Sequence, residues 1–553
     1  MAFDLQAIAF ICGIFLHLLL FCRGEWDRRA PAVVLAYSLL CTSVFAAFAL
    51  DTSYSIVQCI VGTCKASLAL VGGLCTSLVT YRLLFHPLRT FPGPLAARVS
   101  SFWVFREQWP DLRFYFKLRN IHDRYGDFVR IKPRELSICH PDAINDIHGP
   151  RNRIRKGEFY EQIHPAHSLQ FTRDPNQHKH QRRYWDKAFQ TKALQEYSPR
   201  IVKHYKILMG IFSTDGASSA PVDVSKLFMD LFFDVVSDLT FGESFNTLTT
   251  GERNPIIGEF LAYQQSVGFV ILNMWMFHLL RSIPTVASRI LYWMQWYASA
   301  VAKRNEMKDT SPDLYTYLSQ SDTFDVDGIH EAQLAIIAGA DTNAITVSNV
   351  CYLLCQYPEY QKKLYEELAD LPVHENVIED RHLLSQSCLL SLINETLRLY
   401  PPVPGGLQRV TPPDGATIAG RYVPGDMIVS TPTYALHRDS RVFVRPTEFI
   451  PERWTSRPEL ILRKDAFVPF SYGAYNCAGK PLAMMQLRMV IAMVIKKFEL
   501  SFMLEREAEY ERYIHDQADC FTLHLHPLPL ILKERTVREQ VAYNFTRQEG
   551  TES

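Results

Sequence analysis

The sequence predicts a mainly α-helical protein with small β-sheets, preceded by N-terminal transmembrane helices. Three observations support this class. Of the 553 residues, 48% are hydrophobic and 21% are charged, as in folded globular proteins. Only eight charged residues lie in the first 80 positions, which marks an apolar N-terminal part. Between about residues 95 and 533 we find no linker, low-complexity tract or internal repeat, which indicates one large domain.

Three apolar runs, about residues 5–22, 30–50 and 55–81, predict a membrane anchor over residues 1–81. A spanning helix needs roughly 20 apolar residues. The second run meets this length cleanly, whereas the first is slightly short. We expect three spans, with one or two as alternatives. A cleaved signal peptide is the other interpretation of the first run, but it fits poorly because no basic residue precedes the run.

Charged residues are distributed unevenly around these runs. Arg23, Arg28 and Arg29 lie between the first and second runs, and Arg82 follows the third. Asp51 is the only charged residue between the second and third runs. Because cytoplasmic loops carry the excess of Lys and Arg, the pattern predicts a lumenal N-terminus and a cytosolic catalytic domain. We expect a multi-pass protein of the endoplasmic reticulum membrane.

A proline-rich hinge is predicted over residues 82–94. Pro87, Pro92 and Pro94 cannot continue a helix, so the segment is expected to be a stiff connection between the anchor and the next domain. That domain extends over residues 95–533, and a polar tail follows over 534–553.

Within the domain, two stretches have clear secondary-structure signals. The segment from Ile329 to Tyr357 lacks internal proline and precedes Pro358, which predicts a long helix. Short apolar pieces separated by glycines predict β-structure around residues 406–429. The whole chain has 58 basic and 58 acidic residues. This zero net charge argues against nucleic-acid binding, which needs a basic face.

The segment that carries the chemistry has the sequence Phe-Val-Pro-Phe-Ser-Tyr-Gly-Ala-Tyr-Asn-Cys-Ala-Gly-Lys, residues 467–480. A glycine-bearing loop presents Cys477 just before a predicted helix, whose N-terminus stabilises a thiolate. Such a thiolate suits an axial ligand of haem iron. A phosphate-binding loop is the alternative, but five residues separate Gly473 from Gly479, and Pro481 replaces the Ser or Thr that would hold Mg²⁺. A buried structural cysteine is the other alternative.

In this segment the chain resembles the cytochrome P450 family, and the resemblance extends over about 450 residues. Phe470, Gly473, Cys477 and Gly479 match the fixed positions of the family's haem-binding loop. The resemblance implies that Cys477 is the thiolate ligand of haem b (iron protoporphyrin IX). One position departs: where the family usually has Arg or His in contact with a haem propionate, this chain has Tyr475.

Glu395 and Arg398 are the second match. Residues three apart share a helix face and can pair, and such a pair is most often an exposed salt bridge. The apolar surroundings resemble the family's Glu-x-x-Arg helix. The resemblance implies a buried structural triad with Arg453, which serves folding and haem retention.

The third match, Ala-Gly-Ala-Asp-Thr-Asn over residues 338–343, lies in the long predicted helix. A glycine inside a helix costs about 1 kcal/mol relative to alanine, and the resemblance explains Gly339 by room for dioxygen and substrate. An acid followed by Thr in an apolar helix suits proton delivery, which makes Asp341 and Thr342 the catalytic candidates. A polar helix face is the alternative. Asn343 departs from the Thr or Ser usual in the family.

Three cations are expected near the haem propionates. His178 and Arg182 lie one helical turn apart and resemble the family's pair, and Arg409 is the third candidate. Without the family, the histidines around His178 could suggest a metal site, but their spacing matches no common template.

A largely apolar substrate pocket is expected from several segments, although many of their side chains could be core. The candidates are Phe159 and the loop to Phe171, the aromatic residues Phe260, Tyr263, Phe269 and Trp275, the helix residues Ala335 and Gly339, and the segment from Val403 to Leu407.

The resemblance implies a monooxygenase that inserts one atom of O₂ into a lipophilic terpenoid, alkaloid or polyketide, most like fungal microsomal enzymes of secondary metabolism. The alternatives are a haem-thiolate isomerase or dehydratase without O₂ activation, and a non-catalytic haem-binding membrane protein. Only 76 residues follow Cys477, too few for a reductase domain. Electrons are therefore expected from NADPH through a separate cytochrome P450 reductase, with cytochrome b5 as a further donor. Arg488, Lys496 and Lys497 are a candidate docking face, or a solvated face.

Overall fold

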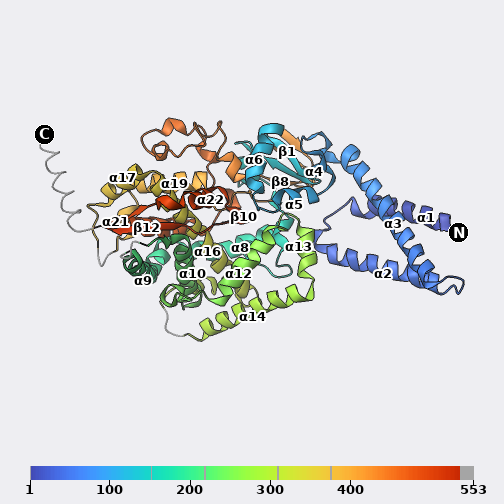
Figure 1. Cartoon of the computed structure of the whole chain (residues 1–553), viewed down its shortest axis with the longest axis horizontal. Helices are drawn as coiled ribbons and strands as arrows, with labels where there is room; N and C mark the ends of the chain where they lie inside the picture. The colour runs from blue at the N-terminus through green and yellow to red at the C-terminus, as the bar shows by residue number, and fades with distance from the viewer. Residues whose placement is uncertain (1, 151, 217–219, 308–310, 374–376, 536–553) are drawn as a thin grey trace.

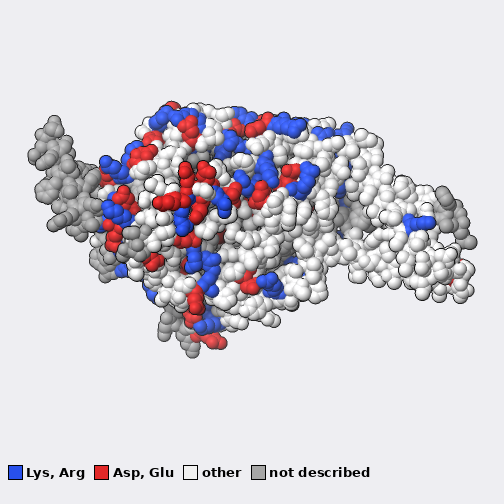
Figure 2. Space-filling view, viewed as in Figure 1, with Lys and Arg blue, Asp and Glu red and all other residues white. Residues whose placement is uncertain are grey.

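The three apolar runs fold into helices that project from the rest of the molecule (Figure 1). The computed structural model describes residues 2–150, 152–216, 220–307, 311–373 and 377–535. The anchor consists of α1 (Ala2–Leu16), α2 (Ala30–Ala49) and α3 (Ile56–Thr80). Its surface is almost without charged residues on the face shown in Figure 2, whereas acidic and basic side chains cover the larger part.

Within the described part of the chain, three helices are long and apolar enough to cross a membrane: Asp27–Ala49, Ile56–Phe85 and Gly328–Gln356. The third is 78% buried inside the protein, so it is a core helix. The first apolar run forms a shorter helix, Leu5–Phe21. It packs closely on α3, because a side chain at Gly13 would overlap the carbonyl oxygen of Leu70, and one at Gly73 would overlap that of Phe10.

The predicted hinge is packed against the catalytic domain. Helix α3 continues through η3 (Tyr81–Phe85), one turn further than the predicted boundary, and η4 (Pro87–Thr90) follows. Leu88 and Phe91 are buried in a core cluster of the domain. The carbonyl oxygen of Pro92 accepts a hydrogen bond from the Arg130 backbone N–H at 2.7 Å. The connection is therefore held against the large domain by buried side chains and a backbone hydrogen bond as well as being rich in proline.

The rest of the described chain is mainly helical, as predicted. Its helices are α4 (Leu95–Val99), α5 (Phe102–Gln108), α6 (Phe114–Tyr125), α7 (Ala143–His148), α8 (Pro175–Ala188), α9 (Thr191–Gly216), α10 (Val224–Phe241), α11 (Thr247–Thr250), α12 (Pro255–Gly268), α13 (Met274–Arg281), α14 (Pro284–Glu306), α15 (Leu314–Leu318), α16 (Phe324–Gln356), α17 (Pro358–Leu368), α18 (Asp380–Leu383), α19 (Ser387–Leu399), α20 (Thr433–Leu436), α21 (Lys480–Lys497) and α22 (Glu507–His515). Single turns include η1 (His17–Phe21), η2 (Asp27–Arg29), η5 (Glu158–Glu161), η6 (Pro451–Trp454) and η9 (Gly473–Tyr475).

The sheets are small, as predicted. A five-stranded sheet has the order β1 (Phe128–Lys132), β2 (Glu135–Ile138), β8 (Ile428–Ser430), β5 (Arg409–Val410) and β3 (Arg155–Lys156). A three-stranded sheet joins β4 (Val222–Asp223), β12 (Pro529–Glu534) and β9 (Phe498–Ser501), and two hairpins pair β6 (Ala416–Ile418) with β7 (Arg421–Val423) and β10 (Ala518–Cys520) with β11 (Thr522–His524). Strands therefore occupy the 406–429 region. Residues 536–553 of the predicted tail lie outside the described part.

Helix α16 runs through the main core, where α10, α19 and α21 pack against it. It begins at Phe324, five residues before the predicted start, and ends one residue before the predicted end. A helix that is buried on most of its faces has apolar residues on most of them. This explains why α16 is also apolar enough to resemble a membrane-spanning helix. Its middle turn lies over the loop that carries Cys477.

Candidate active site

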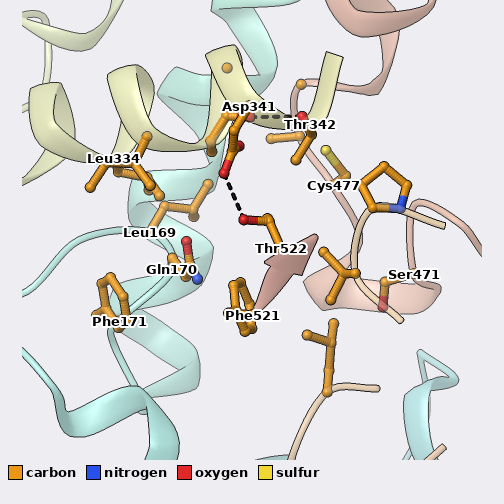
Figure 3. Close-up of a pocket in the computed structure, with 18 of the residues that line it drawn as sticks. Leu169, Gln170, Phe171, Leu334, Asp341, Thr342, Ser471, Cys477, Phe521 and Thr522 are labelled. Atoms are coloured by element: carbon orange, nitrogen blue, oxygen red, sulfur yellow. Dashed lines mark hydrogen bonds between the residues drawn. The ribbon is translucent and has the colours of Figure 1, made fainter. Parts of the chain in front are cut away.

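A cavity of about 500 Å³ lies between α16, the Cys477 loop and the segment that contains η5 (Figure 3). Both Thr342 of α16 and Cys477 line it. Five residues that were predicted from the sequence to form the substrate pocket also line this cavity: Phe159, Ala335, Gly339, Val403 and Leu407. The fold thus brings Phe159 and Cys477, which are more than 300 positions apart in the sequence, to the same cavity.

The Cys477 loop is fixed by its backbone. The Cys477 N–H donates to the Phe470 carbonyl oxygen at 2.9 Å. Gly473 has φ of +72°, and a side chain there would overlap the His148 carbonyl oxygen, so this position requires glycine. Helix α21 begins three residues after the cysteine, and Gly479 precedes its first residue. The loop therefore holds the Cys477 sulfur close to the N-terminus of α21.

Burial is the main influence on the Cys477 thiol, and it raises the pKa above that of a free cysteine. The N–H groups of Gly479 and Lys480 and the charge of Arg182 act in the opposite direction without reversing this shift. A metal cation bound to the sulfur would stabilise the negatively charged thiolate and so lower the pKa of the Cys477 thiol. The chemistry of this sulfur thus fits a metal-bound thiolate.

Asp341 and Thr342 differ in their surroundings, although they are neighbours on α16. The Asp341 Oδ2 accepts hydrogen bonds from Thr522 Oγ1 at 2.7 Å and from Gln264 Nε2 at 3.1 Å. Burial raises the pKa of this carboxyl. The Thr342 hydroxyl donates to the Ala338 carbonyl oxygen at 3.0 Å. In Figure 3, Asp341 points from α16 toward Thr522, and Thr342 points toward the side where Cys477 lies.

The structure adds a packing reason for Gly339. A Cβ there would lie 2.8 Å from Val236 Cγ2 of α10, so the glycine allows two helices to approach as well as leaving space in the cavity. Asn343, the departure from the family pattern, is buried and donates to Gln486 Oε1 at 2.6 Å. It therefore joins α16 to α21 rather than pointing freely into the cavity.

Two buried cations face each other across a pair of strands. Lys156 of β3 is directly opposite Arg409 of β5, and both side chains are buried. Like charges in this position destabilise a sheet. Lys156 Nζ donates to the carbonyl oxygens of Leu169 and Gln170 at 2.9 and 2.8 Å. Neither cation has an ion-pair partner among the described residues, and Arg409 Nε lacks a hydrogen-bond partner there.

His178 and Tyr475 complete this group. The His178 ring packs on the Tyr475 ring at 4.6 Å, and Lys156 and Arg409 lie 5.1 and 5.2 Å from the centre of the same ring. Burial and the neighbouring cations lower the pKa of His178 to about 3, and burial with Arg409 holds the pKa of Lys156 well below its usual range. An anion bound beside these residues would offset the electrostatic repulsion between Lys156 and Arg409.

Arg182, unlike His178 and Arg409, is not among the residues that line the cavity. Its Nη1 donates to the Asn476 carbonyl oxygen at 2.9 Å, and its Nε donates to Asp186 at 2.6 Å. The guanidinium thus braces the Cys477 loop. Lys156, which sequence reasoning missed, takes a place in the cavity wall. The sequence gives little indication that Lys156 belongs to the cavity, because only the folded structure shows that it pairs with Arg409 across two strands.

Glu395, Arg398 and Arg453 form a fully buried cluster away from the cavity. Glu395 accepts hydrogen bonds from Arg398 Nε at 2.9 Å and Nη2 at 2.8 Å, and from Arg453 Nε at 3.0 Å. The Trp454 ring N–H and the Ile450 backbone N–H also donate to it, each at 2.9 Å. The cluster joins α19 to η6.

Other sequence interpretations need correction. Phe269 and Trp275 do not line the cavity; Phe269 packs on Trp109, and Trp275 packs on Phe102. Phe521 was missed, and its ring stacks on Phe159 at 4.9 Å.

The predicted docking face is also not free. Arg488 is buried and pairs with Asp380 at 2.7 Å. Lys496 donates to three carbonyl oxygens at the end of α17, at Leu368, Ala369 and Leu371. These side chains are therefore occupied within the domain.

A cysteine that lines a cavity at a helix N-terminus, opposite a polar turn of a core helix and beside buried cations, is the arrangement that suits a haem-thiolate protein. The chain belongs to the cytochrome P450 family, whose model matches residues 92–513. It is 35% identical to cytochrome P450 monooxygenase nodW of Hypoxylon pulicicidum over 97% of this chain and 99% of the relative. It is also 35% identical to cytochrome P450 monooxygenase FCK2 of Fusarium pseudograminearum (96% and 98%) and 32% identical to tryprostatin B 6-hydroxylase of Neosartorya fischeri (86% and 87%).

The chain is therefore a cytochrome P450 monooxygenase, similar to fungal enzymes of secondary metabolism. Family membership implies a thiolate-ligated haem and a separate reductase. The residues present fit the haem on two counts. Of the cysteines Cys477 and Cys520 that line the cavity, only Cys477 lies at a helix N-terminus, and the buried cations Lys156 and Arg409 lack the anions that two propionates would supply.

Proposed function

We propose that the protein is a membrane-anchored haem-thiolate monooxygenase that oxidises a lipophilic terpenoid, alkaloid or polyketide in fungal secondary-metabolite biosynthesis. The observation that carries this proposal is the cavity lined by both Cys477 and Thr342. Its far walls are apolar and aromatic, with Phe171, Phe260 and Tyr263 among them. Cavities with such walls and few polar groups suit lipophilic ligands.

Each site residue has a proposed role. Cys477 holds the haem iron, and Lys156, His178 and Arg409 face the propionates. The bound haem supplies the oxidising chemistry, with electrons from NADPH through the reductase and with cytochrome b5 as a further donor. Asp341, whose pKa is raised by burial, and Thr342 move protons into the cavity. Asp341 is held by Thr522 and Gln264, so these two residues orient the acid.

The substrate class can be tested by co-expressing the protein with the reductase in yeast. The cells are fed a panel of indole alkaloids, terpenoids and polyketides, and the products are analysed by mass spectrometry. We expect one class to gain one oxygen atom from ¹⁸O₂. An isomerised or dehydrated product without labelled oxygen would instead favour the non-oxidative alternative.

Thr342→Ala is expected to uncouple turnover, because the variant removes a hydroxyl from the proton route beside the cavity. We expect NADPH consumption to persist while product per NADPH falls by about 100-fold, the lower end of the usual range for a proton-transfer group. Hydrogen peroxide should rise correspondingly. The matched control is Thr346→Ala, one turn along α16, whose hydroxyl donates to the Thr342 carbonyl oxygen at 2.8 Å. Equal coupling in both variants would remove Thr342 from the route.

We further propose three spans with the N-terminus in the lumen of the endoplasmic reticulum. This arrangement is supported by the position of residues 22–29, which contact the catalytic domain, as does the end of α3. A glycosylation tag with a flexible spacer should be modified when it is placed at the N-terminus or at residues 51–54. The same tag after residue 535 should stay unmodified. An unmodified N-terminal tag would contradict the three-span topology.

A further inference from the structure

The loop between α1 and α2, residues 22–29, lies against the catalytic domain instead of ending free at the membrane. In Figure 1, α2 begins beside α13. We call this segment the inter-helix loop. It precedes the catalytic domain by more than 60 residues and is separated from it by two further helices. A tether alone does not require such contacts.

Ion pairs join the inter-helix loop to the segment around η5. Arg173 donates to both carboxylate oxygens of Glu25, at 2.7 and 3.0 Å, and to Glu161 at 2.9 Å. Arg134 donates to the Gly24 carbonyl oxygen at 3.3 Å and to Glu158 at 3.0 Å. Bidentate pairs of Arg with carboxylate are stronger and more directional than single surface contacts. The pKa of Glu25 is lowered by Arg173 in spite of burial, which agrees with a carboxylate held by cations.

A second set of contacts joins the inter-helix loop to α13. Asp27 Oδ1 accepts a hydrogen bond from the Trp275 backbone N–H at 2.9 Å. The Trp275 ring N–H donates to Ser101 Oγ at 3.2 Å. Asp27 also hydrogen-bonds the buried Glu158. A single loop of the anchor therefore holds both η5 and the beginning of α13.

Both of these elements are walls of the cavity. Glu158 and Glu161 of η5 face the inter-helix loop, while Phe159 and Tyr160 between them line the cavity. On α13, Trp275 binds the inter-helix loop, whereas Phe277 and Arg281 line the cavity. The two walls touch each other where Arg281 donates to the Gln162 carbonyl oxygen. The inter-helix loop thus lies across the outside of the seam between them.

We propose that the inter-helix loop is a clasp that fixes two walls of the substrate cavity and slows the exit of large ligands. Glu25 and Asp27 are positioning residues in this view: they act through Arg173 and Trp275 and touch no ligand. The anchor then takes part in ligand retention as well as membrane attachment. The inference requires the inter-helix loop to share the catalytic domain's side of the membrane, but it does not depend on the substrate class.

The test uses the full-length haem protein in nanodiscs and two probes, imidazole, which needs little space, and clotrimazole, which is bulky. In Glu25→Ala/Asp27→Ala, which removes both acceptors, clotrimazole should dissociate at least about 10-fold faster, the effect of losing one charge-assisted hydrogen bond. Imidazole binding should be unchanged. Hydrogen exchange should increase in residues 158–171 and 274–281. The control is Asp51→Ala in the other anchor loop, because the Asp51 side chain bonds only Ser53 among the described residues.

A charge exchange separates the clasp from a general structural role. Glu25→Arg should accelerate clotrimazole release, because two guanidinium groups then face each other, and the added change Arg173→Glu should restore slow release. If the double variant above folds poorly, Asp27→Ala alone is tested with the same two probes, and its clotrimazole release decides between the clasp and a passive loop. Unchanged clotrimazole release and hydrogen exchange in folded Asp27→Ala and Glu25→Arg proteins would overturn the proposal.

Discussion

Cys477→Ser is expected to abolish monooxygenase turnover, with a loss of more than about 100-fold. Mutation of a residue that only supports a metal ligand already lowers metal affinity or activity by up to about 100-fold. A serine oxygen is a harder and less electron-donating ligand than a thiolate, and thiolate donation is what favours O–O cleavage on haem iron. The measurement is product formation with the reductase at matched protein concentration.

The matched control for this variant is Cys388→Ser, which changes a partly buried cysteine of the same domain that does not line the cavity. We expect it to retain haem and turnover. Comparable loss in both variants would show that the effect comes from folding, and full activity of Cys477→Ser would remove this residue from the site.

Glu395→Gln is expected to cost about 3–5 kcal/mol of stability, because it leaves the buried charges of Arg398 and Arg453 uncompensated. Glu395 accepts five hydrogen bonds from four residues, and its side chain and those of both arginines are fully buried. Since domains are stable by only about 5–15 kcal/mol, the yield of haem-loaded protein should fall sharply. Thermal unfolding and haem content measure the effect.

The control is Glu243→Gln, which removes an exposed partner of Lys303. Exposed pairs contribute little, so haem content and unfolding temperature should stay close to those of the unchanged protein. If Glu395→Gln were as stable as this control, the cluster around Glu395 would have no role in holding the fold.

Local patterns were sufficient to predict the features that depend on neighbouring residues. The Cys477 loop has its glycines and cysteine within ten residues, and the β-hairpin region has its turns within the same short stretch. The long core helix was predicted because it lacks proline. Its start was placed five residues late, because Asp325 and Asp327 were interpreted as signals before the first turn, whereas the helix already includes them.

Residues whose role depends on strand pairing or distant packing were missed. Lys156 becomes informative only when β3 pairs with β5 and places it opposite Arg409. Thr522 and Gln264 come from a hairpin and a helix that meet at Asp341. Trp275 was assigned to the cavity by its aromatic character, whereas the fold places it beside the inter-helix loop. Such contacts join segments more than 70 positions apart, where single-sequence patterns carry no information.

The central claim is that this chain is a haem-thiolate monooxygenase with Cys477 as the iron ligand. The most direct test is the difference spectrum of the reduced, CO-bound protein in membranes, recorded beside Cys477→Ser. The account predicts a thiolate-type Soret band in the unchanged protein and its loss in the variant. A thiolate-type band that survives in Cys477→Ser, or its absence from the unchanged haem-loaded protein, would contradict the account.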